Sequence, residues 1–325
     1  MTRKSWLLFT ATSVIWGSSF LFIRLAVEHM PPALVVFGRT VLGAAFLVPL
    51  AARQHAFRGV RRVIGPVIAV AVLDMAAPSF LTAWGEEHVS SSVAGILTAT
   101  DPLFTAVLAL WLIRSEVPGR RRTAGLVIGF IGVIALLGID FRGNATELLG
   151  AGAVILSALG YAAAALLYRR WLEDQQAVAV TALMTVISGV IFLPVAAAGL
   201  PRHAPTAGSI AALITLGVVN TGVAYWLFYL LIDEAGAATA AVITYLMPVV
   251  ALFLGVGLLG EPLGIGAIAG LVLIGAGAWL ATSQRAPRGR GDEAGPGDQP
   301  GPAGRPVRPG TGRGGPTPRS SPPPS

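Results

Sequence analysis

The sequence of 325 residues contains no cysteine and a single lysine, Lys4. Without cysteine the chain forms neither a disulfide nor a thiolate metal site. Because Lys4 lies at the N-terminus, no lysine is available within the fold for a phosphate-binding loop or a Schiff base. The histidines, all in predicted loops, are His29, His55, His88 and His203. We therefore expect neither a metal site nor a cofactor.

Charge is also scarce, since charged residues make up 12% of the chain and apolar residues 54%. A soluble domain does not need so much apolar surface, whereas each helix that crosses a bilayer needs roughly 20 apolar residues. The formal net charge of +7 does not indicate nucleic-acid binding, because the arginines sort into predicted membrane-flanking loops and a tail. The composition therefore predicts an all-α membrane protein.

The apolar runs predict ten transmembrane helices. They cover residues 6–27, 33–51, 63–84, 89–113, 123–139, 148–168, 178–199, 208–232, 236–259 and 264–281. The first run follows Arg3 and Lys4, so a signal peptide is its alternative interpretation. The run continues to Ile23, beyond a typical signal core, and no small-x-small cleavage site stands out. We therefore predict a membrane helix.

Basic residues indicate the orientation, because cytoplasmic loops of membrane proteins are enriched in them. With the N-terminus inside, the inner segments hold Arg3, Lys4, Arg53, Arg58, Arg61, Arg62, Arg114, Arg120, Arg121, Arg122, Arg169 and Arg170. The outer loops hold only Arg142 and Arg202. This asymmetry predicts a multi-pass protein of the bacterial inner membrane with both termini in the cytoplasm.

Residues 284–325 differ in composition from the rest of the chain. They are rich in proline, glycine and arginine and have almost no aliphatic side chains, so they cannot bury enough surface to fold. We predict a disordered cytoplasmic tail. Its seven arginines either contact an anionic inner leaflet or remain solvated.

The most informative pattern is an internal repeat about 145 residues long. Val89–Pro102 and Ala235–Pro248 both begin with small residues, continue apolar and reach a proline, and a glutamate follows each run. The copies contain five predicted helices each. Because five is odd, the second copy enters the membrane from the opposite side. An inverted 5+5 repeat of this kind is a known plan for alternating-access transporters.

Several short motifs resemble those of EamA-type transporters of the drug/metabolite transporter superfamily. They are Ile15-Trp-Gly-Ser-Ser-Phe20, Phe37-Gly-Arg39, Asp101-Pro102 and Leu259-Gly-Glu-Pro-Leu263. The resemblance covers residues 1–283. It implies two EamA repeats, at 6–139 and 148–281, cytoplasmic termini, and the transport of small metabolites. The chain departs from the pattern at Arg114-Ser-Glu116, where Leu-Gly-Glu is usual, at Asp74, and at Arg39, whose counterpart is Met184.

Three ionisable residues lie well inside predicted spans: Arg39, Asp74 and Asp101. A charge at the bilayer centre costs about 2.5–3.5 kcal/mol on insertion scales, so it usually faces a cavity or a partner. One interpretation pairs Arg39 with one carboxylate and leaves the other to bind substrate or a proton. The alternative is a structural ion pair that holds the second, third and fourth helices together.

Prolines and aromatic residues add further candidates for the substrate site. Pro102 and Pro248 occupy equivalent helices and predict helix breaks, which either expose carbonyl groups to substrate or serve packing. The aromatic candidates are Trp16, its repeat counterpart Tyr161, Tyr225 and Tyr245. A tyrosine at membrane depth needs a hydrogen-bond partner, which a cavity wall can supply.

Glycines and glutamates in the repeat have structural interpretations. Gly125 with Gly129 and Gly266 with Gly270 have the small-xxx-small spacing of close helix contacts, either within the monomer or in a homodimer. Glu116 and Glu261 each precede a helix, and we predict that they cap the helices that follow them.

Together these features predict a secondary active transporter that exports a small metabolite or drug-like compound by alternating access. Two five-helix bundles would enclose a central site near the bilayer midplane, and proton exchange is a candidate driving force. Two alternatives stay open. The first is a channel or scaffold without coupled transport. The second is a membrane enzyme, for which no nucleophile, metal cluster or cofactor motif is found.

Overall fold

The computed structural model describes residues 2–112, 119–140, 144–201 and 203–282. The predicted tail at 284–325 lies outside the described residues. So do Glu116, Arg114, Arg142 and Arg202.

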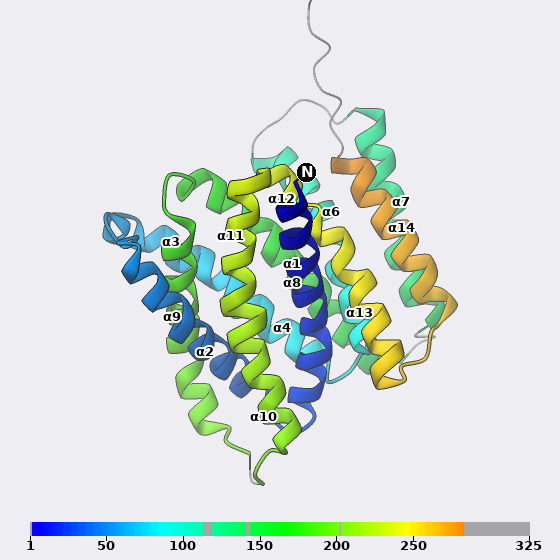
Figure 1. The fold of residues 1–325 in the computed structure, drawn as a ribbon. Helices are drawn as coiled ribbons and strands as arrows, with labels where there is room; N and C mark the ends of the chain where they lie inside the picture. Colours follow the sequence, from blue (N-terminus) through cyan, green and yellow to red (C-terminus); the bar gives the residue numbers. More distant parts are fainter. Residues whose placement is uncertain (1, 113–118, 141–143, 202, 283–325) are drawn as a thin grey trace, which may run out of the picture. The chain divides into compact units, whose positions relative to one another are not determined.

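The regular elements of the described residues are all helical, and no strand occurs among them (Figure 1). The first half contains α1 (Arg3–Val27), α2 (Pro32–Arg53), η1 (Val60–Val63), α3 (Ile64–Val70), η2 (Ala71–Ala76), α4 (Ala77–Gly85), α5 (Ser91–Thr98), α6 (Asp101–Leu112) and α7 (Arg120–Asp140). The second half contains α8 (Ala145–Trp171), α9 (Ala177–Ala198), α10 (Ala207–Ile214), η3 (Thr215–Val223), α11 (Ala224–Ala235), α12 (Ala237–Ala240), α13 (Ile243–Leu259) and α14 (Ile265–Thr282). Each of the ten predicted ranges therefore holds a continuous or interrupted helix.

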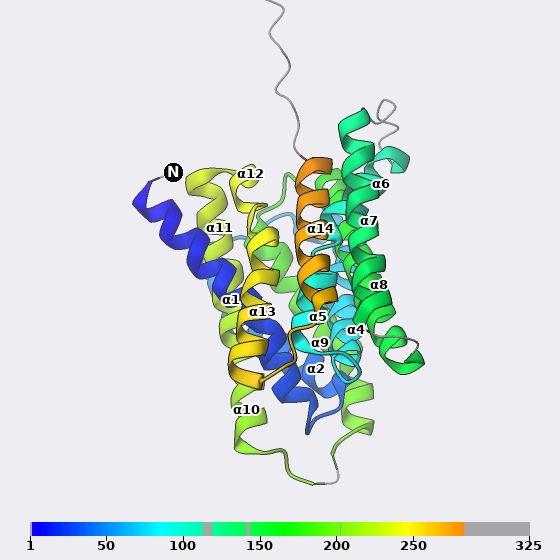
Figure 2. The ribbon, with the colours of Figure 1, turned by 90° about the vertical axis from the view of Figure 1, so that its right-hand side faces the viewer.

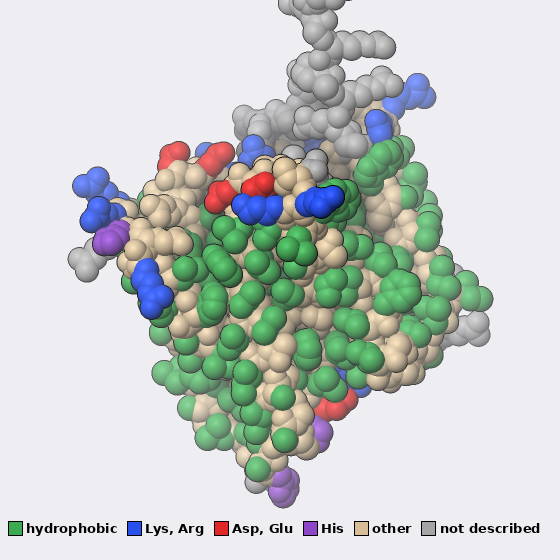
Figure 3. All heavy atoms as spheres, viewed as in Figure 1, with side chains coloured by type: hydrophobic (Ala, Val, Ile, Leu, Met, Phe, Trp, Pro, Cys, Tyr) green, Lys and Arg blue, Asp and Glu red, His purple; other side chains and the backbone are tan. Residues whose placement is uncertain are grey.

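Length and composition suit these helices to a bilayer. Within the described residues, eight helical stretches are long and apolar enough to cross a membrane, and Ile243–Leu259 is a shorter apolar helix. Figure 3 shows apolar side chains over the middle of one face and most of the visible Lys and Arg side chains near the N-terminal end. The predicted fold class, an all-α membrane protein built on a five-helix repeat, is confirmed.

Side-chain caps explain where several helices begin. Thr2 Oγ1 accepts a hydrogen bond from Ser5 N, Ser90 Oγ from Val93 N, and Thr206 Oγ1 from Ser209 N. Each cap satisfies a backbone donor that the first turn of a helix leaves unpaired. The short polar segments between apolar runs thus specify the helix starts locally.

The helical unit has a proximal and a distal end. The proximal end carries the start of α1 and the end of α11, whereas the distal end carries the end of α1 and the start of α10 (Figure 1). Lys4 Nζ lies 2.8 Å from Glu234 Oε2 at the proximal end. Glu86, Ser91 and Glu261 lie at the distal end, because they are at the termini of α4, α5 and α13 there.

The two repeats are interleaved, so the two predicted five-helix bundles share extensive helix contacts. Counterpart helices pack against each other, α2 on α9 and α7 on α14. The helix α1 packs on α10, η3, α11 and α13, and its counterpart α8 packs on α3, η2, α4, α5 and α6. A two-fold axis in the membrane plane explains this arrangement, since helices near the axis meet their own counterparts.

The glycine-rich helices α7 and α14 lie side by side in Figures 1 and 2. A Cβ atom on Gly277 would lie 2.4 Å from Gly129 N, and one on Gly125 would lie 2.5 Å from Ala281 N. Only glycine allows backbones to approach so closely. Gly270 faces Leu136 of α7 in the same interface. Of the two predicted roles for these glycines, the structure shows helix contact within the monomer.

Two π-helical segments occupy equivalent spans, a feature that the sequence did not indicate. The segment η2 (Ala71–Ala76) interrupts the third span, and η3 (Thr215–Val223) interrupts the eighth. A π segment inserts an extra residue into a helix turn and is frequent at functional sites. Asp74 lies in η2, and Asn220 and Thr221 lie in η3.

Candidate functional site

The first part of the site joins Asp74 of η2 to aromatic residues of α1 and α11. Tyr225 Oη donates to Asp74 Oδ2 at 3.4 Å. The Trp16 and Tyr225 rings meet edge to face, with centroids 5.3 Å apart. Trp16 Nε1 donates to the backbone oxygen of Asn220 at 3.2 Å. Residues far apart in sequence therefore surround Asp74 from both repeats.

Arg39 of α2 reaches η3 rather than a carboxylate. Its Nε donates to Thr221 Oγ1 at 2.9 Å, and Thr221 Oγ1 donates to Leu216 O at 2.9 Å. Within the described residues Arg39 forms no ion pair, so the predicted direct pair with Asp74 or Asp101 is absent. The Arg39 guanidinium is still close enough to Asp74 to attract the Asp74 carboxylate electrostatically.

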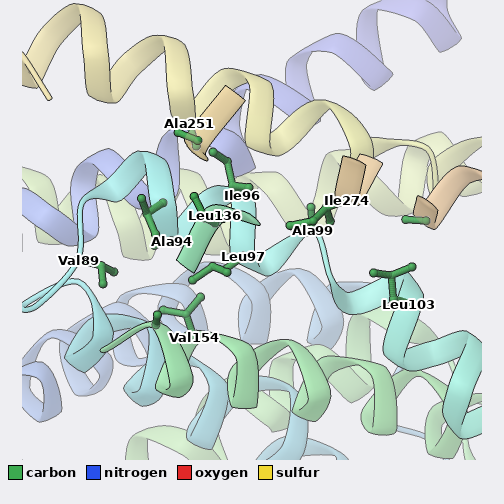
Figure 4. Packing of buried hydrophobic residues seen from close by; sticks show 14 of the residues in the cluster. Val89, Ala94, Ile96, Leu97, Ala99, Leu103, Leu136, Val154, Ala251 and Ile274 are labelled. Atoms are coloured by element: carbon green, nitrogen blue, oxygen red, sulfur yellow. The ribbon is translucent and has the colours of Figure 1, made fainter. Parts of the chain in front are cut away.

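Asp101 begins α6 where the fourth span is interrupted. The helix α5 ends at Thr98, and Leu103 N and Phe104 N both donate to Thr100 O. Figure 4 shows this break between Ala99 and Leu103. Because Pro102 has no N–H, it suits the first turn of α6. Thr105 Oγ1 donates to Asp101 Oδ1 at 3.2 Å.

A helix break at Pro248, predicted by analogy with Pro102, is not found. The helix α13 continues through Pro248, its sixth residue, and the interruption of this span falls at residues 241–242. A proline inside a helix loses one hydrogen bond and kinks the axis without ending the helix. The two repeats therefore place their interruptions differently relative to the proline.

Tyr161 of α8 completes the group from the opposite side. Its hydroxyl hydrogen-bonds the Ser157 side chain, and its ring lies within electrostatic reach of Arg39, Asp74 and Asp101. Ser157 Oγ lies 2.9 Å from Thr82 Oγ1 of α4. The repeat counterparts Trp16 and Tyr161 thus both lie beside the charged residues, as their symmetry suggested.

Tyr245 is the predicted site residue that lies apart. Its hydroxyl is 2.7 Å from Thr282 Oγ1 at the end of α14. The charge of Asp101 reaches it electrostatically, but within the described residues its ring contacts no other aromatic ring. The structure therefore brings together six of the predicted residues: Trp16, Arg39, Asp74, Asp101, Tyr161 and Tyr225. Each of these six is only half-buried and keeps surface that water can touch.

Asn220 and Thr221 were missed by the sequence analysis. Asn220 Nδ2 donates to Ser18 Oγ and Ser19 Oγ, both at 3.1 Å. This contact explains the serines of the Ile15–Phe20 motif, which hold η3 against α1. The available signal was a polar pair in the middle of an otherwise apolar run.

Glu261 caps a different helix from the one predicted. Its Oε1 accepts from Ser91 N at 2.7 Å, and its Oε2 accepts from Ser92 N at 2.9 Å and from Ser92 Oγ. The carboxylate therefore binds the N-terminus of α5 in the first repeat, whereas α14 begins only at Ile265. The left-handed conformation of Gly260, φ +65°, ends α13 and turns the chain toward α5.

The family model described as the EamA-like transporter family matches residues 3–138 and 148–283. The chain belongs to the EamA-like transporter family. Both repeats match the same model, which is the internal duplication that the sequence pattern predicted. Membership of the EamA family points to a multi-pass membrane transporter rather than to an enzyme.

Curated relatives of this EamA protein are also named as transporters. An uncharacterized transporter of Archaeoglobus fulgidus is 21% identical over 87% of this chain and 100% of its own length. The uncharacterized inner membrane transporter YedA of Escherichia coli is 27% identical over 78% of this chain and 82% of its own length. The uncharacterized transporter YoaV of Bacillus subtilis is 22% identical over 84% of this chain and 94% of its own length. A solved crystal structure shares the fold, with a TM-score of 0.62 and 18% identity over 87% of this chain and 98% of that one.

Proposed function

We propose that this EamA-family protein is a secondary active transporter that exports a small polar or amphipathic metabolite or drug-like compound by alternating access. One observation carries the proposal. Tyr161 of the second repeat lies within electrostatic reach of Arg39, Asp74 and Asp101, which all belong to the first repeat. Charged residues inside a membrane usually mark a substrate or ion pathway.

The chemistry of this group supports a substrate with hydrogen-bonding and aromatic character. Within the described residues only Nε of Arg39 has a hydrogen-bond partner, so its two terminal nitrogens are available to an anionic group. Asp74 and Asp101 can accept hydrogen bonds from a donor or cation. Trp16, Tyr161 and Tyr225 offer apolar faces with polar tips.

The interleaved packing suggests which parts move. One group of helices consists of α1, α10–η3–α11 and α13, and its counterpart consists of α8, α3–η2–α4 and α5–α6. Trp16 and Tyr225 belong to the first group, whereas Asp74, Asp101 and Tyr161 belong to the second. Rocking of these groups against each other would open the site alternately to the proximal and distal ends.

We also propose that the proximal end faces the cytoplasm of a bacterial cell and that both termini lie there. The inner segments of the predicted topology, which hold nearly all the arginines, fall at this end. Proton exchange is the proposed driving force. A homodimer is not required for transport, because one chain supplies both halves of the site and the glycines of α7 and α14 contact each other within the monomer.

A ligand screen followed by counterflow tests the proposal. Purified protein would be screened by thermal shift against a metabolite library, because a ligand of the folded state raises its Tm. Hits would then be tested for saturable counterflow in proteoliposomes, which a carrier shows and a channel does not.

The variants Arg39→Ala and Asp101→Asn locate the ligand. Loss of a charged hydrogen bond of about 1.5–3 kcal/mol should weaken ligand affinity roughly 10- to 100-fold. Arg170→Ala, at an exposed proximal position, is the matched control and should bind like the wild type. Unchanged affinity in both site variants would show that the ligand does not bind at this group.

A further inference from the structure

Glu86 is a buried carboxyl group that the proposed substrate site does not use. It follows α4 directly, one residue beyond the membrane span Ile64–Gly85. Its exposed fraction is 0%, and neither carboxyl oxygen has a hydrogen-bond partner within the described residues. An ionised carboxylate is strongly disfavoured in such a place, so the surroundings of Glu86 favour its neutral form.

The charged groups around Glu86 come from three other elements. Glu261, in the connection between α13 and α14, opposes its ionisation, whereas Arg24 of α1 and Arg39 of α2 favour it. The Arg24 guanidinium donates to the backbone oxygen of Glu86 and lies 4.0 Å from Glu28 Oε1. Burial, followed by the Glu261 charge, raises the pKa of Glu86 well above its usual value of 4.5.

The remaining neighbours do not neutralise a charge on Glu86. Glu87 and His88 follow it in the chain, and His88 Nδ1 lies 2.9 Å from Trp84 O. The helix α8 packs along α4 but supplies none of the charged groups that act on Glu86 in the described part of the chain.

Glu261 makes a contact between the two repeats that depends on its own negative charge. Its carboxylate accepts hydrogen bonds from Ser91 N and Ser92 N at the start of α5, where the helix dipole favours an anion. A Cβ atom on Gly255 of α13 would lie 2.3 Å from Ser92 Oγ of α5, so α13 and α5 are tightly closed here. This arrangement, the distal latch, consists of Glu261, Ser91, Ser92 and Gly255.

Two carboxyl groups that share a desolvated region cannot both be ionised cheaply. The latch needs Glu261 in its charged form, so it is compatible only with a neutral Glu86. We propose that Glu86 is the proton-binding site of this transporter, and that loss of its proton opens the distal latch.

This inference rests on the proposed function and identifies the proton as the ion whose movement drives transport. Proton binding would stabilise the conformation closed at the distal end, and opening would admit water that favours proton release. The two events favour each other reciprocally, as linkage requires. Asp74 and Asp101 then remain available for the substrate.

Cysteine labelling can test the latch without knowledge of the substrate. The chain contains no cysteine, so Ser91→Cys provides a single reporter thiol. Ser91 is buried and its Oγ has no hydrogen-bond partner, so the side chain can be exchanged while its backbone N–H still binds Glu261. Labelling of detergent-purified protein by a hydrophilic maleimide would be normalised to the exposed Ala207→Cys variant.

We expect the normalised labelling rate to rise about fivefold or more between about pH 5 and about pH 9, a range in which buried glutamates titrate. With Glu86→Gln the rate should stay low throughout, because the latch no longer meets a second charge. With Glu261→Gln it should be high throughout. Glu87→Gln, the same change one residue away, is the matched control and should behave as the wild type.

Two outcomes would overturn the proposal. A pH response that persists in Glu86→Gln would place the proton elsewhere. The second outcome is a labelling rate that does not change with pH in the wild type, although Glu261→Gln is labelled fast. This result would show that the latch does not respond to protons.

Failure of the proposed function is seen separately, in the counterflow assay at equal pH. Glu86→Gln, whose distal latch should stay closed, should show strongly reduced counterflow there, whereas Glu87→Gln should exchange substrate as the wild type does. Absence of counterflow in the wild type would contradict the transporter proposal while leaving the labelling result unaffected.

Discussion

Residues of the same chemical type have different surroundings in this protein. Glu261 accepts hydrogen bonds from two backbone N–H groups and a hydroxyl. Glu86 accepts none with its carboxyl group in the described part of the chain. Asp74 receives one weak hydrogen bond from Tyr225, and Asp101 one from Thr105. These partners decide which carboxylates can stay charged.

Glu86 should make the stability of the protein depend on pH. Its pKa is raised in the folded state, mainly by burial, above the value of 4.5 expected in the unfolded chain. At a pH between the unfolded-state pKa and the folded-state pKa of Glu86, the folded state holds a proton that the unfolded state has lost. The free energy of unfolding therefore falls as pH rises through this window.

Glu86→Gln removes this titration and should flatten the dependence. At about pH 8 we expect its Tm to exceed that of the wild type by about 2 °C or more, a shift worth roughly 1 kcal/mol in a protein of this size. The difference should vanish well below pH 4.5, where Glu86 of the wild type is neutral in both the folded and the unfolded chain. Thermal melts in detergent across this range measure it, and parallel curves would contradict the expectation.

At the scale of elements, some helices are closely packed and others are interrupted. The α7–α14 pair is tightly packed through glycine, whereas the third and eighth spans carry π segments beside the charged residues. Core residues of α5 such as Ala94, Ile96 and Leu97 lie between Val154 of α8 and Ala251 of α13 (Figure 4). Close glycine packing and π-helical interruptions therefore occur in different spans.

The α7–α14 interface gives a prediction with an internal control. Gly277→Ala would place its Cβ 2.4 Å from Gly129 N, so one backbone must shift. Such overpacking costs roughly 1–3 kcal/mol and should lower the Tm. Gly275→Ala, two residues away in the same helix, meets nothing within 4 Å. It should leave the Tm unchanged or raise it, because alanine favours helix. Equal Tm values for the two variants would contradict the interface.

At the scale of the whole molecule, the repeats are interleaved around the candidate site. This arrangement places each first helix of one repeat with the third and fourth helices of the other. A conformational change therefore has to move parts of both repeats together.

The orientation of the molecule can be measured directly, because introduced thiols are the only ones. Glu173→Cys lies at the proximal end, between α8 and α9, and Ala207→Cys lies at the distal end, where α10 begins. Both positions are exposed. In intact spheroplasts an impermeant maleimide should label Ala207→Cys at once and Glu173→Cys only after permeabilisation. The reverse pattern would place both termini outside.

The sequence by itself determined the all-helical fold class, the approximate limits of the helices and the repeat, because apolar periodicity and caps are local properties. It also singled out six candidate site residues, since polar and aromatic residues stand out in apolar runs: Arg39, Asp74, Asp101, Trp16, Tyr161 and Tyr225. Their role in binding stays a prediction. Only the tertiary structure decided that Arg39 bonds Thr221, that Glu261 caps α5, and that Glu86 is enclosed without a partner. These facts depend on contacts between residues up to 182 positions apart in the chain. Such contacts arise from helix packing, and no pattern within a single helix encodes them.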